Sequence, residues 1–430
     1  MKARISLSLF LVVTCLSTAQ DHPPFRVKYV NGKWFDGHAF ISRPYYSVGG
    51  TLHPNDPRRI DQTVDLAGGY VIPACGEAHN HNATKSNTAA LGRYVAHGIL
   101  YVENPENLPD ERLDAAVLNR PDGPDVIFAN GAITAPGGHP LALVKRNIER
   151  GGMTEAQGEG AFYYAVGSAA ELESKLQKLL GTKPDLVKII LVYSEDFEHR
   201  KNDDKYFSRR GVDPSLVAPL VARVHNAGLR VSAHVESAHD FSVAVRAGVD
   251  QIAHMPGFWP DEESQKGGSM AKYLIRPADA RLAAKKKIIV ITTLMETLER
   301  ADQSSDRNLA DNMIATARHN FDLLRRNGVP IAIGSDQFRK DTADEALQLM
   351  KHGFLSTAEM LNAWCSLTPR IIFPNRRVGA LRDGFEANFS VLRADPLSSP
   401  EALVTLPQLV FKRGKLIGGT EAKEQTKGRQ

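Results

Sequence analysis

The sequence is poor in cysteine and in net charge. Three Cys in 430 residues are too few for a small scaffold held together by disulfides. The formal net charge is only +4, from 53 basic and 49 acidic residues, so the charge balance gives no reason to expect nucleic acid or a membrane surface as a partner. With 42% hydrophobic and 24% charged residues, the composition is that of a folded globular protein and excludes a disordered chain.

The chain begins with an apolar run that is too short to span a membrane. Ile5 to Leu16 falls below the ~20 apolar residues that a spanning helix requires. Two basic residues precede this run and Ser17-Thr18-Ala19 follows it, which predicts a secretory signal peptide, residues 1–19, cleaved after Ala19. Lipidation at Cys15 is disfavoured because a poor approach sequence, Val-Val-Thr, precedes it. We therefore expect an exported protein, periplasmic or secreted.

Cleavage would leave a nearly neutral chain with two cysteines. The net charge would fall from +4 to +2, because the removed segment carries Lys2 and Arg4 and no acidic residue. An export compartment permits disulfides, but Cys75 and Cys365 are far apart in the sequence and each stands in an apolar context. We expect them to be buried, unpaired small hydrophobic residues.

Short strand-like segments at both ends predict one small β domain. Residues 25–65 combine β-type pieces with Gly, Asn and Pro turns, and residues 388–392 and 408–411 return to that pattern. We expect the two ends to fold together as a β-sandwich built from residues 20–70 and 377–420. Residues 421–430 are polar and predict a flexible tail.

Helix and strand patterns alternate between these ends. Apolar residues at helical spacing cover residues 214–227, 238–247 and 307–327, and each stretch stops at a Gly that precedes a short apolar strand. With roughly eight such strands, the pattern predicts an α/β fold with a (β/α)8 TIM-like barrel over residues 71–376. No GxGxxG opens a helix, which argues against an open dinucleotide-binding sheet.

Two connections in the predicted barrel are unusually long. Residues 193–213 and 256–277 each follow a strand that carries a polar residue at its C-terminal end, where barrels place their active sites. We interpret them either as substrate loops or as solvated surface excursions.

Polar residues at the ends of the predicted strands carry the chemistry. His79 and His81 stand at i and i+2, so they point to the same face of a strand and can bind one ion. His234 ends RVSAHV, His254 ends VDQIAHM and Asp336 ends VPIAIGSD. Neutral imidazoles with a carboxylate suit Zn, and also Mn, Fe or Co. Taken singly, each of these residues is as well explained as an ordinary buried polar group.

Lys188 lies inside the apolar strand DLVKIILV, where a solvated ammonium has no room. Because burying a charged amine is costly, the position requires an explanation. Either the side chain reaches solvent at a sheet edge, or the uncharged amine reacts with carbon dioxide to give a carbamate, whose two oxygens can bridge two cations.

The order of these residues resembles that of a known superfamily. HxH, a Lys in a VKI strand, two AH strand ends and GSD together resemble the amidohydrolase superfamily of metal-dependent hydrolases, most closely its imidazolonepropionase-like and Xaa-Pro dipeptidase-like branch. The likeness covers nearly the whole mature chain, including ANFSVLRADPL and VFKRGKLI near its end. The resemblance therefore implies a barrel enzyme that holds two divalent metal ions.

The resemblance also implies roles for individual residues. One metal would be bound by His79, His81 and Asp336, the second by His234 and His254, and carbamylated Lys188 would bridge them. A hydroxide between the metals would attack the carbonyl of a C–N bond, and Asp336 would accept its proton and pass it to the leaving amine. His139, in a Gly-Gly-His loop, would face the substrate. Tyr193 and Glu236 are further candidates for substrate contact. A packed strand-end tyrosine is the better explanation of Tyr193, and a solvated start of the next loop explains Glu236 equally well.

The sequence departs from the superfamily pattern beside the first metal ligand. Glu77 stands where Asp is usual, and Cys75-Gly76 replaces branched aliphatic residues. Neither change removes a metal ligand, but both put the surroundings of the ligands in question.

Three functions remain open at this point. The first is an exported binuclear amidohydrolase acting on an amide, a cyclic amide or a dipeptide. The second is a mononuclear deaminase on the same fold, with Lys188 merely buried. The third is an exported protein that binds metal or a small ligand without turnover. The substrate, the metal and the oligomeric state, a homo-oligomer included, stay undetermined.

Overall fold

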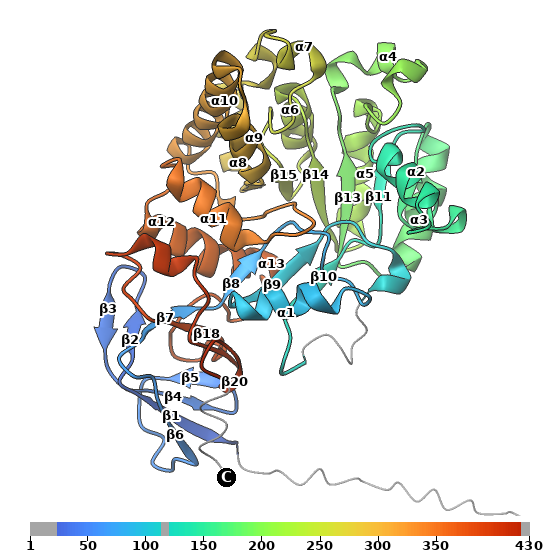
Figure 1. Cartoon of the computed structure of the whole chain (residues 1–430). Coiled ribbons are helices and arrows are strands. Elements are labelled where there is room, and N and C mark those ends of the chain that lie inside the picture. The colour runs from blue at the N-terminus through green and yellow to red at the C-terminus, as the bar shows by residue number, and fades with distance from the viewer. Residues whose placement is uncertain (1–23, 113–119, 423–430) are drawn as a thin grey trace, which may run out of the picture.

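The computed structural model describes residues 24–112 and 120–422. The predicted signal peptide lies outside these residues, as does the predicted tail from residue 423 onward. Parallel strands and most helices form the upper part of the molecule, and strands from both ends of the chain form the lower part (Figure 1). The fold is thus of the mixed α/β class.

The upper part contains a parallel sheet of seven strands. Their order is β12 (Tyr163–Ala165), β11 (Ala132–Thr134), β13 (Leu186–Ile190), β14 (Arg230–His234), β15 (Gln251–Ala253), β16 (Ile289–Ile291) and β17 (Ile331–Ala332). A second parallel sheet of three strands runs in the order β10 (Asp125–Phe128), β9 (Ile99–Asn104) and β8 (Cys75–Glu77). Since the strands are parallel, their carboxyl ends lie on one side of the sheet.

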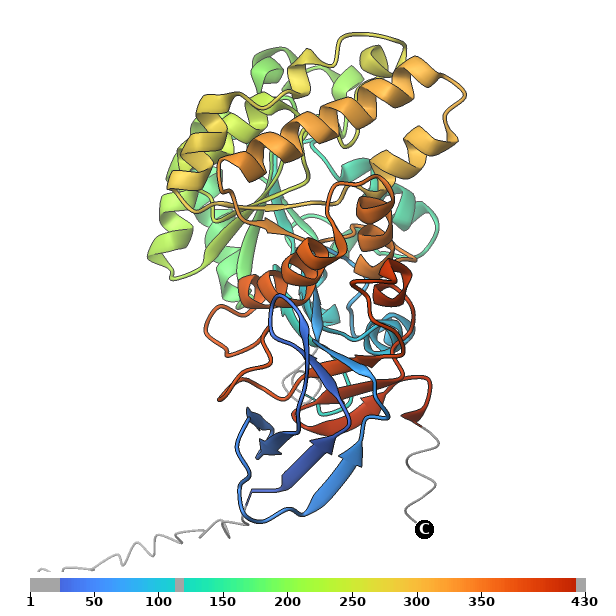
Figure 2. The same cartoon turned by 90° about the vertical axis from the view of Figure 1, so that its left-hand side faces the viewer.

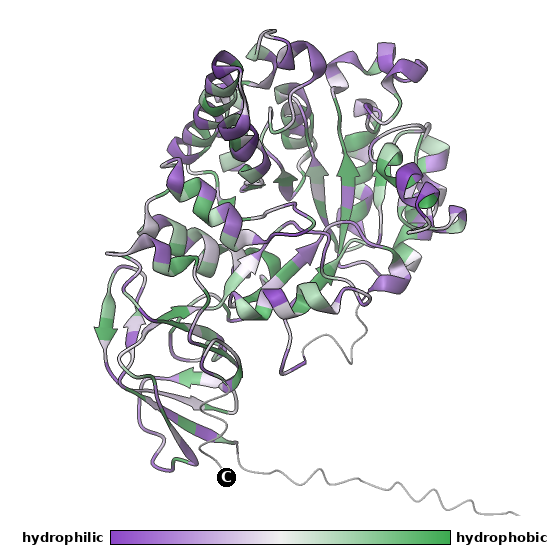
Figure 3. Cartoon of the chain, viewed as in Figure 1, coloured by the Kyte–Doolittle hydropathy of each residue, from purple (hydrophilic) through white to green (hydrophobic). Residues whose placement is uncertain are grey.

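Helices connect the parallel strands and cover their outer face (Figure 2). The helices of the upper part are α1 (Thr88–Ala96), α2 (Leu141–Glu149), α3 (Ala169–Gly181), α4 (Phe197–Arg200), α5 (Pro214–Asn226), α6 (Ala238–Ala247), α7 (Glu262–Gln265), α8 (Pro277–Lys285), α9 (Met295–Gln303), α10 (Arg307–Arg326), α11 (Thr342–Lys351), α12 (Thr357–Met360) and α13 (Thr368–Ile372). A π-helical segment, Leu361–Leu367, joins the last two. Figure 3 shows apolar residues along the central strands and polar residues on the outer helices, as a buried parallel sheet requires.

The three helices expected from apolar spacing are α5, α6 and α10, each within one residue of its predicted bounds. A side-chain oxygen caps the N-terminus of each helix. Gly228, Gly248 and Gly328 follow the three helices with φ of 75°, 83° and 76°, a conformation that a residue with Cβ adopts only with strain. Local sequence therefore determines where these helices stop.

The lower part contains two sheets. One has the order β5 (Thr51–His53), β4 (Tyr45–Val48), β1 (Arg26–Val30) and β6 (Gln62–Asp65). The other has the order β20 (Lys415–Gly418), β19 (Leu409–Lys412), β18 (Phe389–Leu392), β7 (Tyr70–Pro73), β2 (Lys33–Phe35) and β3 (Phe40–Ser42). Aromatic rings from both ends of the chain meet here, with Tyr29 and Trp34 packed edge-on or tilted against Phe389.

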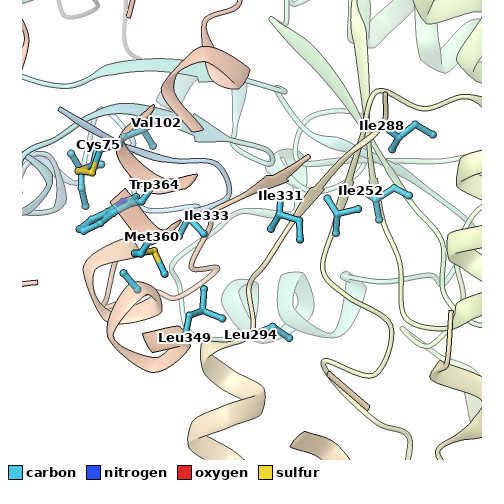
Figure 4. Packing of buried hydrophobic residues seen from close by; sticks show 14 of the residues in the cluster. Cys75, Val102, Ile252, Ile288, Leu294, Ile331, Ile333, Leu349, Met360 and Trp364 are labelled. Carbon is cyan, nitrogen blue, oxygen red and sulfur yellow. A yellow bond between two sulfur atoms is a disulfide. The ribbon is translucent and has the colours of Figure 1, made fainter. Parts of the chain in front are cut away.

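The expectation of two unpaired cysteines is wrong. Cys75, at the start of β8, forms a disulfide with Cys365 in the π-helical segment (Figure 4). Both residues are buried, as expected, but their separation of 290 residues gave no indication of contact. The pair forms because Trp364 and Met360 pack that segment against the strand region, and this packing exists only in the folded chain.

No described helix combines the length and the apolar character needed to cross a membrane.

Candidate active site

Four of the predicted metal ligands meet beyond the carboxyl ends of the strands. His79 and His81 follow β8, His254 follows β15 and Asp336 lies in the loop after β17. The Oδ1 atom of Asp336 is 3.2 Å from His81 Nε2 and 3.9 Å from His79 Nε2, and its Oδ2 atom is 3.8 Å from His254 Nε2. Ligand atoms of His79, His254 and Asp336 all lie within 4.8 Å of one another, which is compatible with a shared metal ion.

His234 and Lys188 adjoin this group. The ring of His234, the last residue of β14, lies 4.5 Å from that of His254, centroid to centroid. Lys188, in the middle of β13, is 3% exposed and lies opposite Ser232 of β14, two residues before His234. The structure therefore gathers all six residues predicted from the sequence.

Hydrogen bonds orient two of the imidazoles. His81 Nδ1 donates to the main-chain carbonyl of Glu106 (3.1 Å), and His254 Nδ1 pairs with Thr293 Oγ1 (2.7 Å). Because Nδ1 is engaged in each ring, Nε2 is the nitrogen that faces Asp336. Engagement of the second ring nitrogen is the usual way in which proteins orient a histidine ligand.

Burial keeps the histidines neutral. It is the main cause that lowers the pKa of His79, His234 and His254 well below the usual value. Neutral imidazole has a free lone pair, so these residues are in the state that binds a metal.

Glu77, the departure from the superfamily pattern, does not point at the cluster. Its carboxylate accepts hydrogen bonds from the main-chain N–H (2.9 Å) and the hydroxyl (2.6 Å) of Ser335, and from the main-chain N–H of His79 (3.2 Å). It is fully buried, and burial raises its pKa. Glu77 thus ties the segment that carries His79 to the loop that carries Asp336.

Backbone conformation at several strand ends is strained. His254, Thr293 and Asp336 have φ of 74°, 46° and 49°, and Tyr193 has φ of 49°. Non-glycine residues in the left-handed region cost of order 1–3 kcal/mol each and cluster at functional sites. The strain falls on the same edge of the sheet as the histidine cluster, which supports this edge as the active site.

Sequence reasoning missed Glu106, two residues beyond β9. Its side chain is 5% exposed, and Glu106 Oε2 lies 3.7 Å from Lys188 Nζ. Burial raises the pKa of Glu106, and Lys188 opposes that effect. The rule that a strand end carries function would have singled out this residue, because Glu106 stands at the end of the strand next to β8.

The three predicted substrate residues are placed differently. The ring of His139, in the loop between β11 and α2, stacks on His234 at 4.9 Å and an interplanar angle of 25°. Glu236 Oε1 is 3.2 Å from His234 Nε2, and Glu236 Oε2 is buried without a hydrogen-bond partner among the described residues. The hydroxyl of Tyr193 pairs with that of Tyr273 at 3.1 Å. His139 and Glu236 thus adjoin the cluster, and Tyr193 has a partner of its own.

Two cavities lie elsewhere on the same part of the molecule. One, of about 480 Å³, is lined by residues 194–199 and by the first turn of α5. The other, of about 570 Å³, lies between α9 and the loop after β15, and Arg300, stacked on Trp259, lines it. Neither cavity is lined by a predicted metal ligand.

Several solved structures share the fold of this chain. No protein-family model and no curated protein matches the sequence. Among solved structures, ochratoxinase of A. niger aligns at 16% identity with a TM-score of 0.70, covering 93% of this chain and 97% of that chain. A structure described as an amidohydrolase aligns at 17% identity with a TM-score of 0.69, and the alignment covers 92% of this chain and 100% of that chain. A Xaa-Pro dipeptidase with bound methionine in its active site aligns at 16% identity with a TM-score of 0.66, and the alignment covers 92% of this chain and 100% of that chain.

The chain has the amidohydrolase fold. Because the alignments include more than nine-tenths of the chain, the amidohydrolase fold extends over the parallel strands and the sheets built from both termini. The likeness inferred from the order of ligands is therefore supported by structures of low sequence identity.

The residues of the cluster fit a divalent metal ion. His79 is fully buried, and neither of its ring nitrogens has a hydrogen-bond partner in the described part of the chain. A buried imidazole left without partners costs free energy that metal coordination would recover. The partnerless nitrogens of His79, beside Asp336 and two oriented imidazoles, are the strongest sign of a metal centre.

Proposed function

We propose that this chain is an exported, metal-dependent amidohydrolase that cleaves a C–N bond in an amide, a cyclic amide or a dipeptide. The observation that carries the proposal is the meeting of His79, His254 and Asp336 at the strand ends of this fold. Support comes from the amidohydrolase and the Xaa-Pro dipeptidase that share the architecture. Small molecules or dipeptides are the expected substrates.

Each residue of the cluster has a role in this proposal. His79, His81 and Asp336 would hold one divalent ion, His234 and His254 would hold a second, and Lys188, if carbamylated, would supply a ligand to both. Zn is the ion that this donor set favours, with Mn, Fe or Co as alternatives. When bound, the metals supply Lewis-acid activation of water and of the substrate carbonyl.

The remaining steps belong to side chains of this chain. Asp336 accepts the proton of the attacking water at its carboxylate and delivers it to the leaving nitrogen, which would otherwise depart as an unstable anion. His139, stacked on His234, faces the substrate. Glu236, also beside His234, offers its second carboxylate oxygen to the same space, and Tyr193 is a candidate for a more distant contact.

We also propose that the parallel strands close into a barrel. The main-chain N–H of Ala78 donates to Ile333 O (3.0 Å) and that of Asp336 to His79 O (2.8 Å), which links the segment after β8 to the segment after β17. These bonds support a (β/α)8 barrel over residues 71–376. The sheets from residues 20–70 and 377–420 would form the β-sandwich beside it.

Export also belongs to the proposal. The predicted cleavage after Ala19 lies outside the described residues, but the disulfide between Cys75 and Cys365 supports an oxidising compartment, since such bonds are rare in the cytosol. N-terminal sequencing of the secreted protein tests this step.

Metal analysis and a substrate panel test the proposed activity. We expect about two divalent ions per chain after reconstitution with bicarbonate, and turnover of a member of a panel of dipeptides, N-acyl amino acids and cyclic amides. Lys188→Ala should lose one ion and at least ~10³-fold in kcat/KM, because the bridge between the two ions is gone. Lys178→Ala, on the exposed side of α3, is the matched control. Full metal content and turnover in Lys188→Ala would contradict the bridging role, and tight ligand binding without turnover across the panel would favour a binding protein.

One observation favours a second candidate, a mononuclear deaminase-like enzyme. The carboxylate of Glu106 lies 3.7 Å from Lys188 Nζ, and both side chains are buried. Glu106 is a partner that would stabilise Lys188 as an ammonium, which cannot carry the carbamate. One ion per chain, unaffected by bicarbonate, would favour this candidate.

Glu106→Gln separates the two candidates by its effect on stability. If Lys188 is an ammonium, the variant leaves a buried charge unpaired and lowers the free energy of unfolding by about 3–5 kcal/mol. If Lys188 is a carbamate, the variant removes a like-charged neighbour, and we expect a change smaller than ~1 kcal/mol. Denaturant unfolding of the metal-loaded protein, with and without bicarbonate, measures the difference.

A further inference from the structure

The long connection after β13 packs against the Gly-Gly-His loop rather than standing free. The main-chain N–H of His139 donates to Arg210 O (2.9 Å), and the N–H of Ser208 donates to Gly137 O (2.7 Å). A third bond joins the N–H of Ala142 to Ser208 Oγ (3.0 Å). Residues 208–210 therefore pack along the loop that carries His139 and are hydrogen-bonded to it.

Arg210 is the centre of this contact. Its side chain is buried, at 7% exposed, although arginine is normally a surface residue. Arg210 Nε donates to Pro136 O (2.9 Å), on the Gly-Gly-His loop, while Nη1 donates to Arg200 O (2.8 Å), at the end of α4. The guanidinium group suits this position because its rigid, planar set of N–H donors can bind several carbonyl oxygens at once.

The neighbouring glycines leave room for this arrangement. A Cβ added at Gly137, where φ is 66°, would lie 2.1 Å from Arg210 Nη2. A Cβ at Gly138 would lie 2.5 Å from Thr134 Oγ1 and 2.7 Å from Arg210 O. Gly137 thus leaves room for the guanidinium at a positive φ, and Gly138 allows the close approach of the Arg210 main chain and of Thr134.

The same segment is anchored to the strand of Lys188. The N–H of Val212 donates to Ile190 O (2.8 Å), and a Cβ at Gly211 would lie 2.3 Å from that oxygen. Residues 208–212 thus connect the loop of His139 to the end of β13, which carries Lys188.

We propose that Arg210 is a positioning residue that clamps the Gly-Gly-His loop and so fixes His139 against His234. The connection of residues 193–213 is therefore a fixed support of the active site. This inference rests on the proposed function for the role of His139 towards substrate, but the clamp itself is independent of that function. Since a displacement of about 1 Å can cost on the order of 10²-fold in rate, loss of the clamp has a measurable effect.

Two variants break the clamp from opposite sides. Arg210→Met removes the guanidinium donors and keeps an apolar stem of similar length, and Gly137→Ala places a methyl group where the guanidinium lies. Arg209→Met is the matched control, because Arg209 is the adjacent residue, is exposed, and contacts Glu262 on the surface. Arg210→Lys keeps the charge but not the planar set of donors, so we expect its amide exchange to fall between that of the wild type and that of Arg210→Met.

Hydrogen exchange and metal content test the clamp without any substrate. We expect amide exchange in residues 136–142 to be at least ~10-fold faster in Arg210→Met and in Gly137→Ala than in the wild type, with unchanged metal content. Arg209→Met should exchange like the wild type. Wild-type exchange in residues 136–142 of both clamp variants would overturn the proposal.

A double-mutant cycle tests whether Arg210 acts through His139. With the best substrate of the panel, Arg210→Met should lower kcat/KM about 10- to 100-fold, but less than ~3-fold in a His139→Ala background. An equal loss in both backgrounds would show that Arg210 does not act through His139. Absence of wild-type turnover on the whole panel would instead count against the proposed function, and the exchange result would still decide the clamp.

Discussion

Asp336→Asn is expected to lower kcat by at least ~10³-fold while the protein stays folded. Asp336 is the carboxylate shared by His79, His81 and His254, and it is the proposed carrier of the proton from water to the leaving nitrogen. Asparagine has nearly the same shape and an oxygen that faces the same neighbours, but its amide accepts no proton at neutral pH. Proton transfer by a positioned general base typically accelerates a reaction 10²–10⁴-fold. We therefore expect the fold-decrease in kcat to be larger than the fold-decrease in bound metal.

The measurement requires saturating metal. Turnover of Asp336→Asn is compared with its metal content, determined on the same sample, and with Asp311→Asn, a substitution at an exposed position of α10. Turnover within ~10-fold of the wild type at equal metal content would show that another group carries the proton.

Removal of the disulfide is expected to have the largest effect on stability. The bond between Cys75 and Cys365 closes a loop of 290 residues, for which the chain-entropy relation gives a stabilisation of about 5–6 kcal/mol. We expect the double variant Cys75→Ala with Cys365→Ala to lose most of this amount in denaturant unfolding. Because Cys75 opens the strand that leads to His79 and His81, the variant should also release metal at a lower denaturant concentration.

Thiol titration is the control for this prediction. Both cysteines are buried, so the wild-type protein is titrated after unfolding without reductant. We expect no free thiol from this pair. Two free thiols from Cys75 and Cys365 would contradict the disulfide, and the double variant should then unfold within ~1–2 kcal/mol of the wild type.

The helices were predictable because their signals are local. Apolar spacing, a capping side chain and a terminal glycine all lie within the α5, α6 and α10 segments or next to them. The same holds for His79, His81 and Asp336, because a polar residue at the end of an apolar strand faces the carboxyl edge of a parallel sheet whatever the rest of the chain does.

Contacts between distant segments were not predictable in this way. Glu106 stands just beyond the end of β9, where the strand-end rule could have singled it out, but only the folded chain brings its carboxylate within 3.7 Å of Lys188 Nζ. The pairing of Cys75 was wrongly excluded for the same reason. Residues 193–213 were equally well explained as a solvated surface excursion, yet the Arg210 side chain in this connection is buried and donates to Pro136 O.

The sequence by itself determined the residue types of the site, their order, and the alternation of helices and strands that carries them. Those features depend on side-chain chemistry and on spacings of a few residues, which the chain expresses before it folds. Only the tertiary structure decided which charge faces Lys188, which cysteines pair, and what holds His139 in place. Each of these is a contact between segments far apart in the sequence, and it exists only where the packing of strands and loops brings those segments together.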